Sequence, residues 1–301
     1  MKAIIFGVTG QDGSHLVELL LEKNYNVVGV ARRSSVDTTE RIEHLLDDPR
    51  FNLVSGDITD VSSVYGILRN NGDVDEVYNL AAQSHVGISF RQPGLTWDIT
   101  GKGCLNILQG IVDLEIDCKF YQASSSEMFG GSYDVDEFGK FQDEETKFLP
   151  QSPYAIAKCA AHYMVRLFRE AYGTHASAGI LFNHEGPRRG ENFVTRKITK
   201  WVGDFAAWKK ENERGYESSG DVSSLVFSED FIHLGKGRVF ADAKATPGIP
   251  KLRLGNLEAS RDWGYAGDYV EAIWQILQQE KPDDFVISTG ENYSIEDFVK
   301  E

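Results

Sequence analysis

The chain reads Gly7-Val8-Thr9-Gly10-Gln11-Asp12-Gly13 between an apolar run at 3–6 and a helical pattern at 14–23. Its glycines follow the spacing G-x-x-G-x-x-G. Residues without a Cβ let a backbone turn tightly and approach a phosphate, and the start of a helix presents N–H groups to an anion. An ordinary glycine-rich turn is the alternative. The position between a first strand and a first helix favours a loop that binds a dinucleotide.

The residues that follow this loop alternate between strand and helix patterns. Several apolar runs have no polar face, which is typical of central strands in a parallel sheet that is covered on both sides. We therefore predict an α/β fold with a doubly wound parallel sheet, the Rossmann arrangement. The expected strands span 3–6, 26–30, 51–54, 76–80, 119–122 and 177–182, and the expected helices span 14–23, 61–70, 103–112 and 154–171.

The alternation breaks down after residue 182. We predict a first domain at 1–184, to which 262–290 partly return, and a smaller α/β domain at 185–301. The polar region at about 204–250 is expected to be an elaborated loop with a hairpin near 233–240. A helix at 269–277, a strand at 285–288 and a helix that begins at Ser294, with Asp297 beside its start, are expected to follow. Because the sequence stops soon after that start, we expect the C-terminal end of the domain to be missing.

Charge and composition restrict the class of protein. A formal net charge of −15 argues against general binding to nucleic acid or anionic membranes. No apolar run approaches the roughly 18 residues that a membrane span needs. The few, widely spaced cysteines indicate neither a disulfide framework nor a metal site, and histidines such as His162 show no metal-ligand spacing and are interpreted as structural. We expect a cytoplasmic protein that binds no metal, nucleic acid or membrane.

The end of the second expected strand indicates which dinucleotide binds. An acidic residue there would contact the ribose 2′-hydroxyl of NAD. The chain instead has Arg32-Arg33-Ser34-Ser35. A guanidinium forms charge-assisted bidentate contacts with a phosphate, so NADP is favoured over the alternative of a solvated basic turn. Asp57 and the run at 80–84 follow the next two strands, where adenine and nicotinamide-ribose contacts are expected.

Tyr154 and Lys158 are four residues apart in an expected helix and therefore share one helix face. Lowering the pKa of a phenol from about 10 to about 7 needs roughly 4 kcal/mol of differential stabilisation. A unit charge about 4 Å away supplies about that much at an effective dielectric constant of about 20. Lys158, together with an oxidised nicotinamide, is therefore expected to make Tyr154 a usable base.

Ser125 and Glu127 follow the fifth expected strand, at the sheet edge where α/β proteins bind ligands. A serine there can hydrogen-bond a hydroxyl that is being oxidised. The oxidation of an alcohol needs no carboxylate, but the removal of a proton next to a carbonyl does, and Glu127 fits that role. The alternative for Glu127 is an acidic residue that stabilises a helix start.

Together these motifs resemble the extended short-chain dehydrogenase/reductase family, and within it the GDP-mannose 4,6-dehydratases. The resemblance covers nearly the whole chain apart from 204–250. Its most specific part is the run at 179–197. The matching runs lie at 7–14, 32–35, 41–45, 78–86, 120–127, 152–158, 168–172, 181–197, 255–264, 268–274 and 284–290.

The resemblance implies an NADP-dependent lyase that converts GDP-mannose to GDP-4-keto-6-deoxymannose and water, the first step towards GDP-fucose or other GDP-deoxyhexoses. It implies Ser125, Glu127, Tyr154 and Lys158 as catalytic residues, a smaller domain that binds the sugar nucleotide, and a homodimer or homotetramer with subunit contacts at 32–45. Implied cofactor contacts are Gly7, Thr9, Gly10, Gln11, Asp12, Gly13, Arg32, Asp57, Ile58, Leu80, Ala81, Ala82, Gln83, Ser84, Tyr154, Lys158, His184 and Arg189; implied substrate contacts are His85, Val86, Asn183, Asn192, Lys197, Arg253 and Arg261.

The chain departs from the family pattern at four places. Ser125 replaces the usual threonine, which keeps the hydroxyl but loses the methyl group that restricts its rotamer. The loop between Glu127 and Tyr154 is longer than usual, 204–250 is expanded, and the family normally continues beyond residue 301. Two alternatives therefore stay open: a related epimerase or dehydratase that acts on another nucleotide sugar, and a catalytically silent scaffold that binds NADP.

Overall fold

The computed structural model describes residues 1–212, 238–240 and 252–301. The chain divides into two compact units. The first comprises Met1–Gly186 and Gly264–Thr289, and the second comprises Pro187–Trp263 and Gly290–Glu301.

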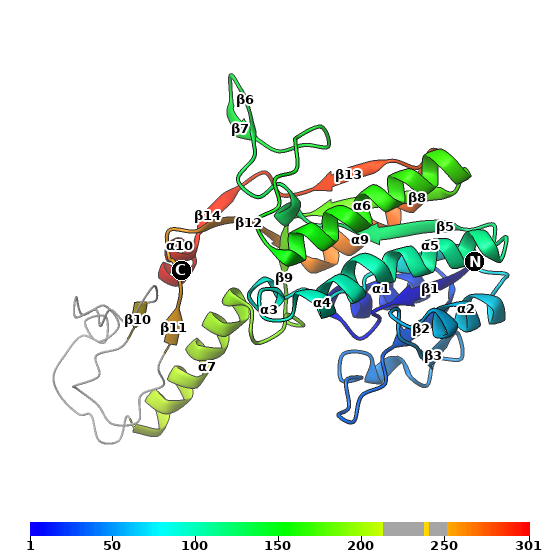
Figure 1. Cartoon of the computed structure of the whole chain (residues 1–301). Coiled ribbons are helices and arrows are strands. Elements are labelled where there is room, and N and C mark those ends of the chain that lie inside the picture. The colour runs from blue at the N-terminus through cyan, green and yellow to red at the C-terminus, as the bar shows by residue number, and fades with distance from the viewer. Residues whose placement is uncertain (213–237, 241–251) are drawn as a thin grey trace. The chain divides into compact units, whose positions relative to one another are not determined.

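A seven-stranded sheet forms the centre of the first unit (Figure 1). Its strands lie in the order β13-β8-β5-β4-β1-β2-β3, and every neighbouring pair is parallel. The order runs outward in both directions from β1, so the predicted doubly wound parallel sheet is confirmed. The strands are β1 (Lys2–Phe6), β2 (Asn26–Ala31), β3 (Phe51–Ser55), β4 (Glu76–Asn79), β5 (Lys119–Ala123), β8 (His175–Leu181) and β13 (Asp284–Ile287).

Helices cover both faces of this sheet. On one face α1 (Gln11–Glu22) and α9 (Ala266–Gln278) share a hydrophobic cluster with the sheet. On the other face α2 (Val61–Asn70), α5 (Gly103–Asp113) and α6 (Pro153–Tyr172) form a second cluster. Both faces of β1 are buried, because Ala3 and Ile5 pack in the first cluster and Ile4 and Phe6 in the second. Shorter helical turns are η1 (Glu43–Leu45), α3 (Val86–Ser89), α4 (Pro93–Thr96), η2 (Trp97–Lys102) and η3 (Ser126–Met128).

The long segment between Glu127 and Tyr154 contains a small antiparallel hairpin of β6 (Asp134–Asp136) and β7 (Gly139–Phe141). Gly139 takes a φ of +127°, a left-handed backbone that favours glycine. Phe138, at the turn, is 90% exposed. The residue type at this turn is therefore not set by packing within the chain.

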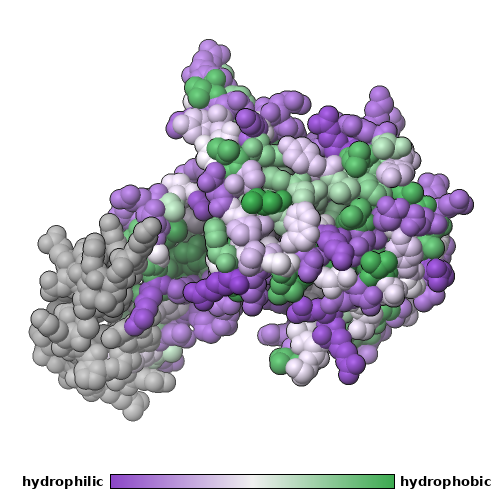
Figure 2. All heavy atoms as spheres, in the orientation of Figure 1, coloured by the Kyte–Doolittle hydropathy of each residue, from purple (hydrophilic) through white to green (hydrophobic). Residues whose placement is uncertain are grey.

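The outer side of α6 also carries apolar side chains. Ile156, Tyr163 and Leu167 are each about half exposed, and their spacing places them on one side of the helix. Figure 2 shows hydrophobic residues on this face of the first unit, over α5 and α6.

The second unit contains α7 (Val194–Asn212) and short antiparallel strands. Strand β10 (Arg238–Phe240) pairs with β11 (Leu252–Leu254), and β12 (Ser260–Tyr265) pairs with β14 (Asn292–Ser294). The last helix, α10 (Ile295–Lys300), begins with a capping box in which the side chains of Ser294 and Asp297 each accept a backbone N–H, as the sequence predicted. A small core joins α7, β11 and α10 through Ile198, Leu252, Leu254, Leu257, Trp201 and Phe298.

The prediction that an elaborated loop starts near 204 is wrong, because α7 continues to Asn212. Trp201, Phe205 and Trp208 recur at helical spacing, and their rings stack along α7 with centroid distances of 5.3 and 5.9 Å. In the sequence, the polar and charged residues of this stretch mask the helical period of the three aromatic residues. Of the hairpin expected near 233–240, residues 238–240 form β10, and 233–237 lie outside the described residues.

The helices in the described ranges include none that is long and apolar enough to cross a membrane. Cys104, Cys118 and Cys159 are all free thiols.

Candidate active site

The glycine loop connects β1 to α1 and is held by close backbone contacts. Gly7 has a φ of +88°, and a Cβ built on it would lie 2.8 Å from the backbone N of Ala81, at the end of β4. A Cβ on Gly13 would lie 2.3 Å from the carbonyl oxygen of Gly7. Gly10 stands at the N-cap of α1 without a side-chain cap. The glycines thus let the loop close tightly on the start of α1, whose first N–H groups are suited to an anion.

The other residues predicted to contact the cofactor follow the sheet edge. Arg32 comes directly after β2 and is exposed. Asp57, after β3, accepts hydrogen bonds from the backbone N (2.9 Å) and hydroxyl (2.8 Å) of Thr59. Gln83, after β4, donates from its side-chain Nε2 to Thr96 Oγ1 (3.0 Å). The carboxyl ends of neighbouring strands thus bring these residues to one edge, which also holds Thr9, Gln11, Ile58, Leu80, Ala82 and Ser84.

His184 lies in β9 (Asn183–Glu185), just after β8, and contacts the start of α1. Its Nε2 is 3.0 Å from Asp12 Oδ2, and its Nδ1 is 2.8 Å from the carbonyl oxygen of Phe182. Its ring stacks on Tyr269 of α9 at a centroid distance of 4.5 Å. The structure thus brings His184 and Asp12, both predicted to contact the cofactor, together.

Tyr154 and Lys158 occupy the first turns of α6. Ser152 caps this helix by accepting a hydrogen bond from the backbone N of Ala155 (3.1 Å), and Pro153 occupies its first position. Both side chains are buried, and the Nζ of Lys158 lies 5.8 Å from the ring centroid of Tyr154. The predicted shared helix face is confirmed.

The ammonium of Lys158 is held inside the unit. Its Nζ donates to the carbonyl oxygen of Ala123, at the end of β5, over 2.6 Å. Burial lowers the pKa of Lys158 to about 8, although the nearby Asp12 carboxylate acts in the opposite direction. Because burial also raises the pKa of the Cys104 thiol to about 12, that thiol remains neutral beside it.

Ser125 and Glu127 lie in the turn that leaves β5. Ser125 is buried and caps η3, since its Oγ accepts a hydrogen bond from the backbone N of Glu127 (3.3 Å). Glu127 is partly exposed. The fold therefore places Ser125 and Glu127 directly after Ala123, the residue that binds Lys158.

The residues predicted to contact substrate are divided between the units. In the first unit, His85 caps α3 with its Nδ1, which accepts from the backbone N of Ile88 (3.2 Å); Val86 begins α3 and Asn183 begins β9. In the second unit, the Nζ of Lys197 donates to the carbonyl oxygen of Arg253. The second unit also holds Asn192 and Arg261. It further holds Arg189, which was predicted to contact the cofactor and whose guanidinium lies 3.7 Å from the ring centroid of Phe193.

Two residues of the site region were not predicted as functional. Arg41 donates from Nη1 to the carbonyl oxygen of Thr9 in the glycine loop (3.3 Å). His162, interpreted as structural, lies one further turn along the face of α6 that carries Tyr154 and Lys158, and it contacts Ser124. The spacing i, i+4, i+8 was the available signal for His162.

A family model described as GDP-mannose 4,6 dehydratase matches residues 4–220 and 229–301. The chain belongs to the GDP-mannose 4,6-dehydratase family. It is 46% identical to GDP-mannose 4,6 dehydratase 1 of Arabidopsis thaliana, over 99% of this chain and 72% of that protein. It is 44% identical to the GDP-mannose 4,6-dehydratase of Vibrio cholerae, over 99% of this chain and 70% of that protein.

Solved structures agree on the fold of this family member. The dTDP-glucose 4,6-dehydratase of Streptomyces venezuelae, determined with NAD and TYD bound, superposes with a TM-score of 0.74 at 20% identity, over 100% of this chain and 79% of that one. The doubly wound parallel sheet of the first unit is therefore a fold that this chain shares with that solved structure.

Proposed function

We propose that this chain is a GDP-mannose 4,6-dehydratase that works by internal redox chemistry with a bound NADP. One observation carries the proposal. The family model matches nearly the whole chain, and the chain has all four proposed catalytic residues, Ser125, Glu127, Tyr154 and Lys158, on adjoining elements. Glu127 argues against simple epimerisation, which needs no such acid–base group. A silent scaffold would not need to retain the whole set.

The residues at the sheet edge fit a nicotinamide dinucleotide. The turn at Gly7 and Gly13 leaves no room for a Cβ, which lets the loop pack tightly against the start of α1, where a pyrophosphate would lie. For NADP in particular, the support is Arg32 directly after β2, where NAD-binding chains carry an acid. Arg41, which donates a hydrogen bond to the carbonyl oxygen of Thr9, adds a second guanidinium near the glycine loop.

Tyr154 acts first in the proposed cycle. A nicotinamide, when bound, would supply hydride exchange between C4 and C6 of the sugar without net consumption of the cofactor. Tyr154 accepts the proton of the C4 hydroxyl, while Ser125 hydrogen-bonds the same oxygen. Lys158 contributes positive charge at the buried end of this proton path, because its Nζ is fixed on Ala123.

Glu127 carries out the elimination. The C4 ketone acidifies the hydrogen on C5, and the Glu127 carboxylate accepts that proton. The carboxylic acid then protonates the hydroxyl that leaves C6, so water departs and a C5–C6 double bond forms. Tyr154 then gives the proton that it took from the C4 hydroxyl to C5, and with the hydride exchange that the nicotinamide would supply at C6 the product is GDP-4-keto-6-deoxymannose.

The remaining parts of the proposal concern binding and assembly. We propose that the second unit binds the sugar nucleotide, with Lys197 and Arg261 near the diphosphate, because fixed cations are the usual partners of such a group. We propose a homodimer or homotetramer in the cytoplasm. The support for the oligomer is the exposed run at 32–38 within the segment 32–45 and the apolar outer side of α6. Light scattering that gives a monomer would contradict the oligomer.

The test is mass spectrometry of GDP-mannose incubated with the purified protein and NADP. The expected result is loss of one water without net accumulation of NADPH. Glu127→Gln should lower turnover by about 100- to 10,000-fold, the usual contribution of a general acid–base group. Glu137→Gln, on the exposed turn of the hairpin, is the matched control and should behave as the wild type. An unchanged sugar nucleotide, or full turnover in Glu127→Gln, would refute the proposed reaction.

A further inference from the structure

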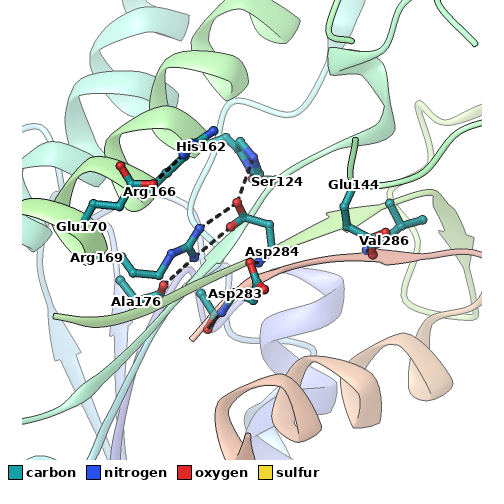
Figure 3. A network of polar contacts seen from close by, with 11 residues as sticks. Ser124, Glu144, His162, Arg166, Arg169, Glu170, Ala176, Asp283, Asp284 and Val286 are labelled. Carbon is teal, nitrogen blue, oxygen red and sulfur yellow. Dashed lines mark hydrogen bonds and ion pairs between the residues drawn. The ribbon is translucent and has the colours of Figure 1, made fainter. Parts of the chain in front are cut away.

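A chain of mostly buried polar contacts joins residues of elements that are distant in sequence (Figure 3). The Oγ of Ser124 is 3.1 Å from Nδ1 of His162, and Nε2 of His162 is 3.5 Å from Oδ2 of Asp284 on β13. Arg169 binds both carboxylate oxygens of Asp284, over 3.1 and 2.9 Å. Ser124 and His162 are 4% and 5% exposed, so water is almost absent from this contact.

The direction of the hydrogen bond between Ser124 and His162 follows from charge. Burial lowers the pKa of His162, with Arg169 and Arg166 acting in the same direction and Asp284 opposing them, so the imidazole is neutral. The single ring proton belongs on Nε2, which faces the Asp284 carboxylate. Nδ1 is then an acceptor, and the hydroxyl of Ser124 donates to it.

This contact is the second of two that fix α6 to the end of β5. Lys158 donates to the carbonyl oxygen of Ala123, and His162 accepts from the next residue, Ser124. Tyr154, Lys158 and His162 share one face of α6 at successive turns. The strand end is therefore tied to the helix at two consecutive residues.

The position of Ser125 depends on these two hydrogen bonds between α6 and the end of β5. Successive residues of an extended chain point to opposite sides, and Ser125 is extended with φ −156° and ψ 140°. With Ser124 turned towards His162, Ser125 is turned away from it. The Oγ of Ser125 then holds the backbone of Glu127.

We propose that His162 is a positioning residue, which acts through Ser124 to hold Ser125 and Glu127 in register with Tyr154. Asp284, fixed by Arg169, orients the imidazole. Neither His162 nor Ser124 touches the substrate in this assignment. The inference rests on the proposed function, since it concerns the geometry of that reaction.

The test uses variants of His162 that each keep one of its two contacts, either the contact with Ser124 or the contact with Asp284. His162→Asn places an amide oxygen near the position of Nδ1, so it keeps an acceptor for Ser124 and loses Asp284. His162→Gln reaches the position of Nε2, so it keeps a donor for Asp284 and loses Ser124. If His162 acts through Ser124, kcat for dehydration of GDP-mannose should fall about 10-fold or more in His162→Gln and in Ser124→Ala, with KM nearly unchanged. His162→Asn should stay within about 3-fold of wild type.

A purely structural role gives a different pattern. In that case the loss of kcat would follow the loss of thermal stability in each variant, and His162→Asn would be no better than His162→Gln. The double variant Ser124→Ala/His162→Gln should be no slower than either single variant, because both break one contact. Additive losses, or wild-type kcat in Ser124→Ala, would overturn the inference while leaving the proposed function intact. A wild-type chain that leaves GDP-mannose unchanged overturns the proposed function, and the inference with it.

Discussion

Replacing Lys158 with methionine should abolish turnover and stabilise the fold. Methionine keeps the length of the apolar stem and removes the ammonium, which is buried at 3% exposure. The carbonyl oxygen of Ala123, the partner of Nζ, still accepts a hydrogen bond from Nε2 of Gln122 (2.8 Å). The substitution therefore leaves no buried acceptor without a donor there, and what it removes is chiefly the cost of a buried charge.

The size of that cost follows from the lowered pKa of Lys158, which falls from 10.5 to about 8 on folding. Such a difference corresponds to about 3 kcal/mol in the free energy of unfolding. A folded-state pKa below the unfolded one means that the unfolded chain binds the proton more tightly. The penalty is thus complete below pH 8 and disappears as the pH rises towards 10.5. The advantage of Lys158→Met should be about 3 kcal/mol at pH 7, about 2 at pH 9 and about 1 at pH 10.

The measurement is denaturant unfolding of both proteins without cofactor, followed by tryptophan fluorescence at these three pH values. The difference between the two proteins cancels every other titrating group. Cys104, the neighbouring thiol, stays neutral over this range, since burial raises its pKa to about 12. Lys281→Met, at an exposed position, is the control and should show no pH-dependent difference. A less stable Lys158→Met, or an advantage that does not shrink with pH, would refute the reasoning.

Three further predictions concern other parts of the site. Arg32→Ala should weaken NADP binding about 10- to 100-fold and leave NAD binding nearly unchanged, measured by titration, because a charge-assisted contact is worth roughly 1.5–3 kcal/mol; equal losses for both would contradict a 2′-phosphate contact. Gly13→Ala should lower the free energy of unfolding by about 1–3 kcal/mol and weaken NADP binding, since the added Cβ would meet backbone atoms. Gly66→Ala in α2 is the control, where a Cβ meets nothing within 4 Å, and thermal unfolding should show it to be neutral or stabilising. Leu167→Lys on the outer side of α6 should shift the oligomer towards monomer in light scattering, and Val61→Lys, equally exposed on α2, should not; identical masses would remove α6 from the subunit contact.

Local patterns were sufficient for most of the sheet and for the first turns of α6. The glycine loop could be placed because its spacing and its two flanking elements are contiguous in the chain. Tyr154 and Lys158 could be paired because four residues are one helical turn. The same argument worked for the capping box at Ser294, where both partners lie within three positions.

Other features depend on packing that local patterns do not show. The turn at Gly7 is required by the backbone of Ala81, which reaches it through the pairing of β1 with β4. The hairpin β6–β7 carries mostly exposed residues, so no burial pattern marks its strands. In α7 the stacked rings that begin at Trp201 accompany a helix that runs to Asn212, and the charged residues between the aromatic positions mask its helical period in the sequence. The predicted roles of the site residues remain predictions, because they concern ligands.

The case of His162 shows why a histidine without a motif is hard to interpret from sequence. Its position on α6 was predictable, but its partner Ser124 is 38 positions away and Asp284 comes from the far end of the unit. Only the sheet order, which places β8 between β5 and β13, brings the three together. Since α6 carries Tyr154 while β5 leads into Ser125, the two halves of the proposed site lie on separate elements. The contacts of Lys158 and His162 hold α6 and the end of β5 in register. A substitution at His162 or Ser124 should therefore slow the reaction although it removes none of the proposed catalytic residues.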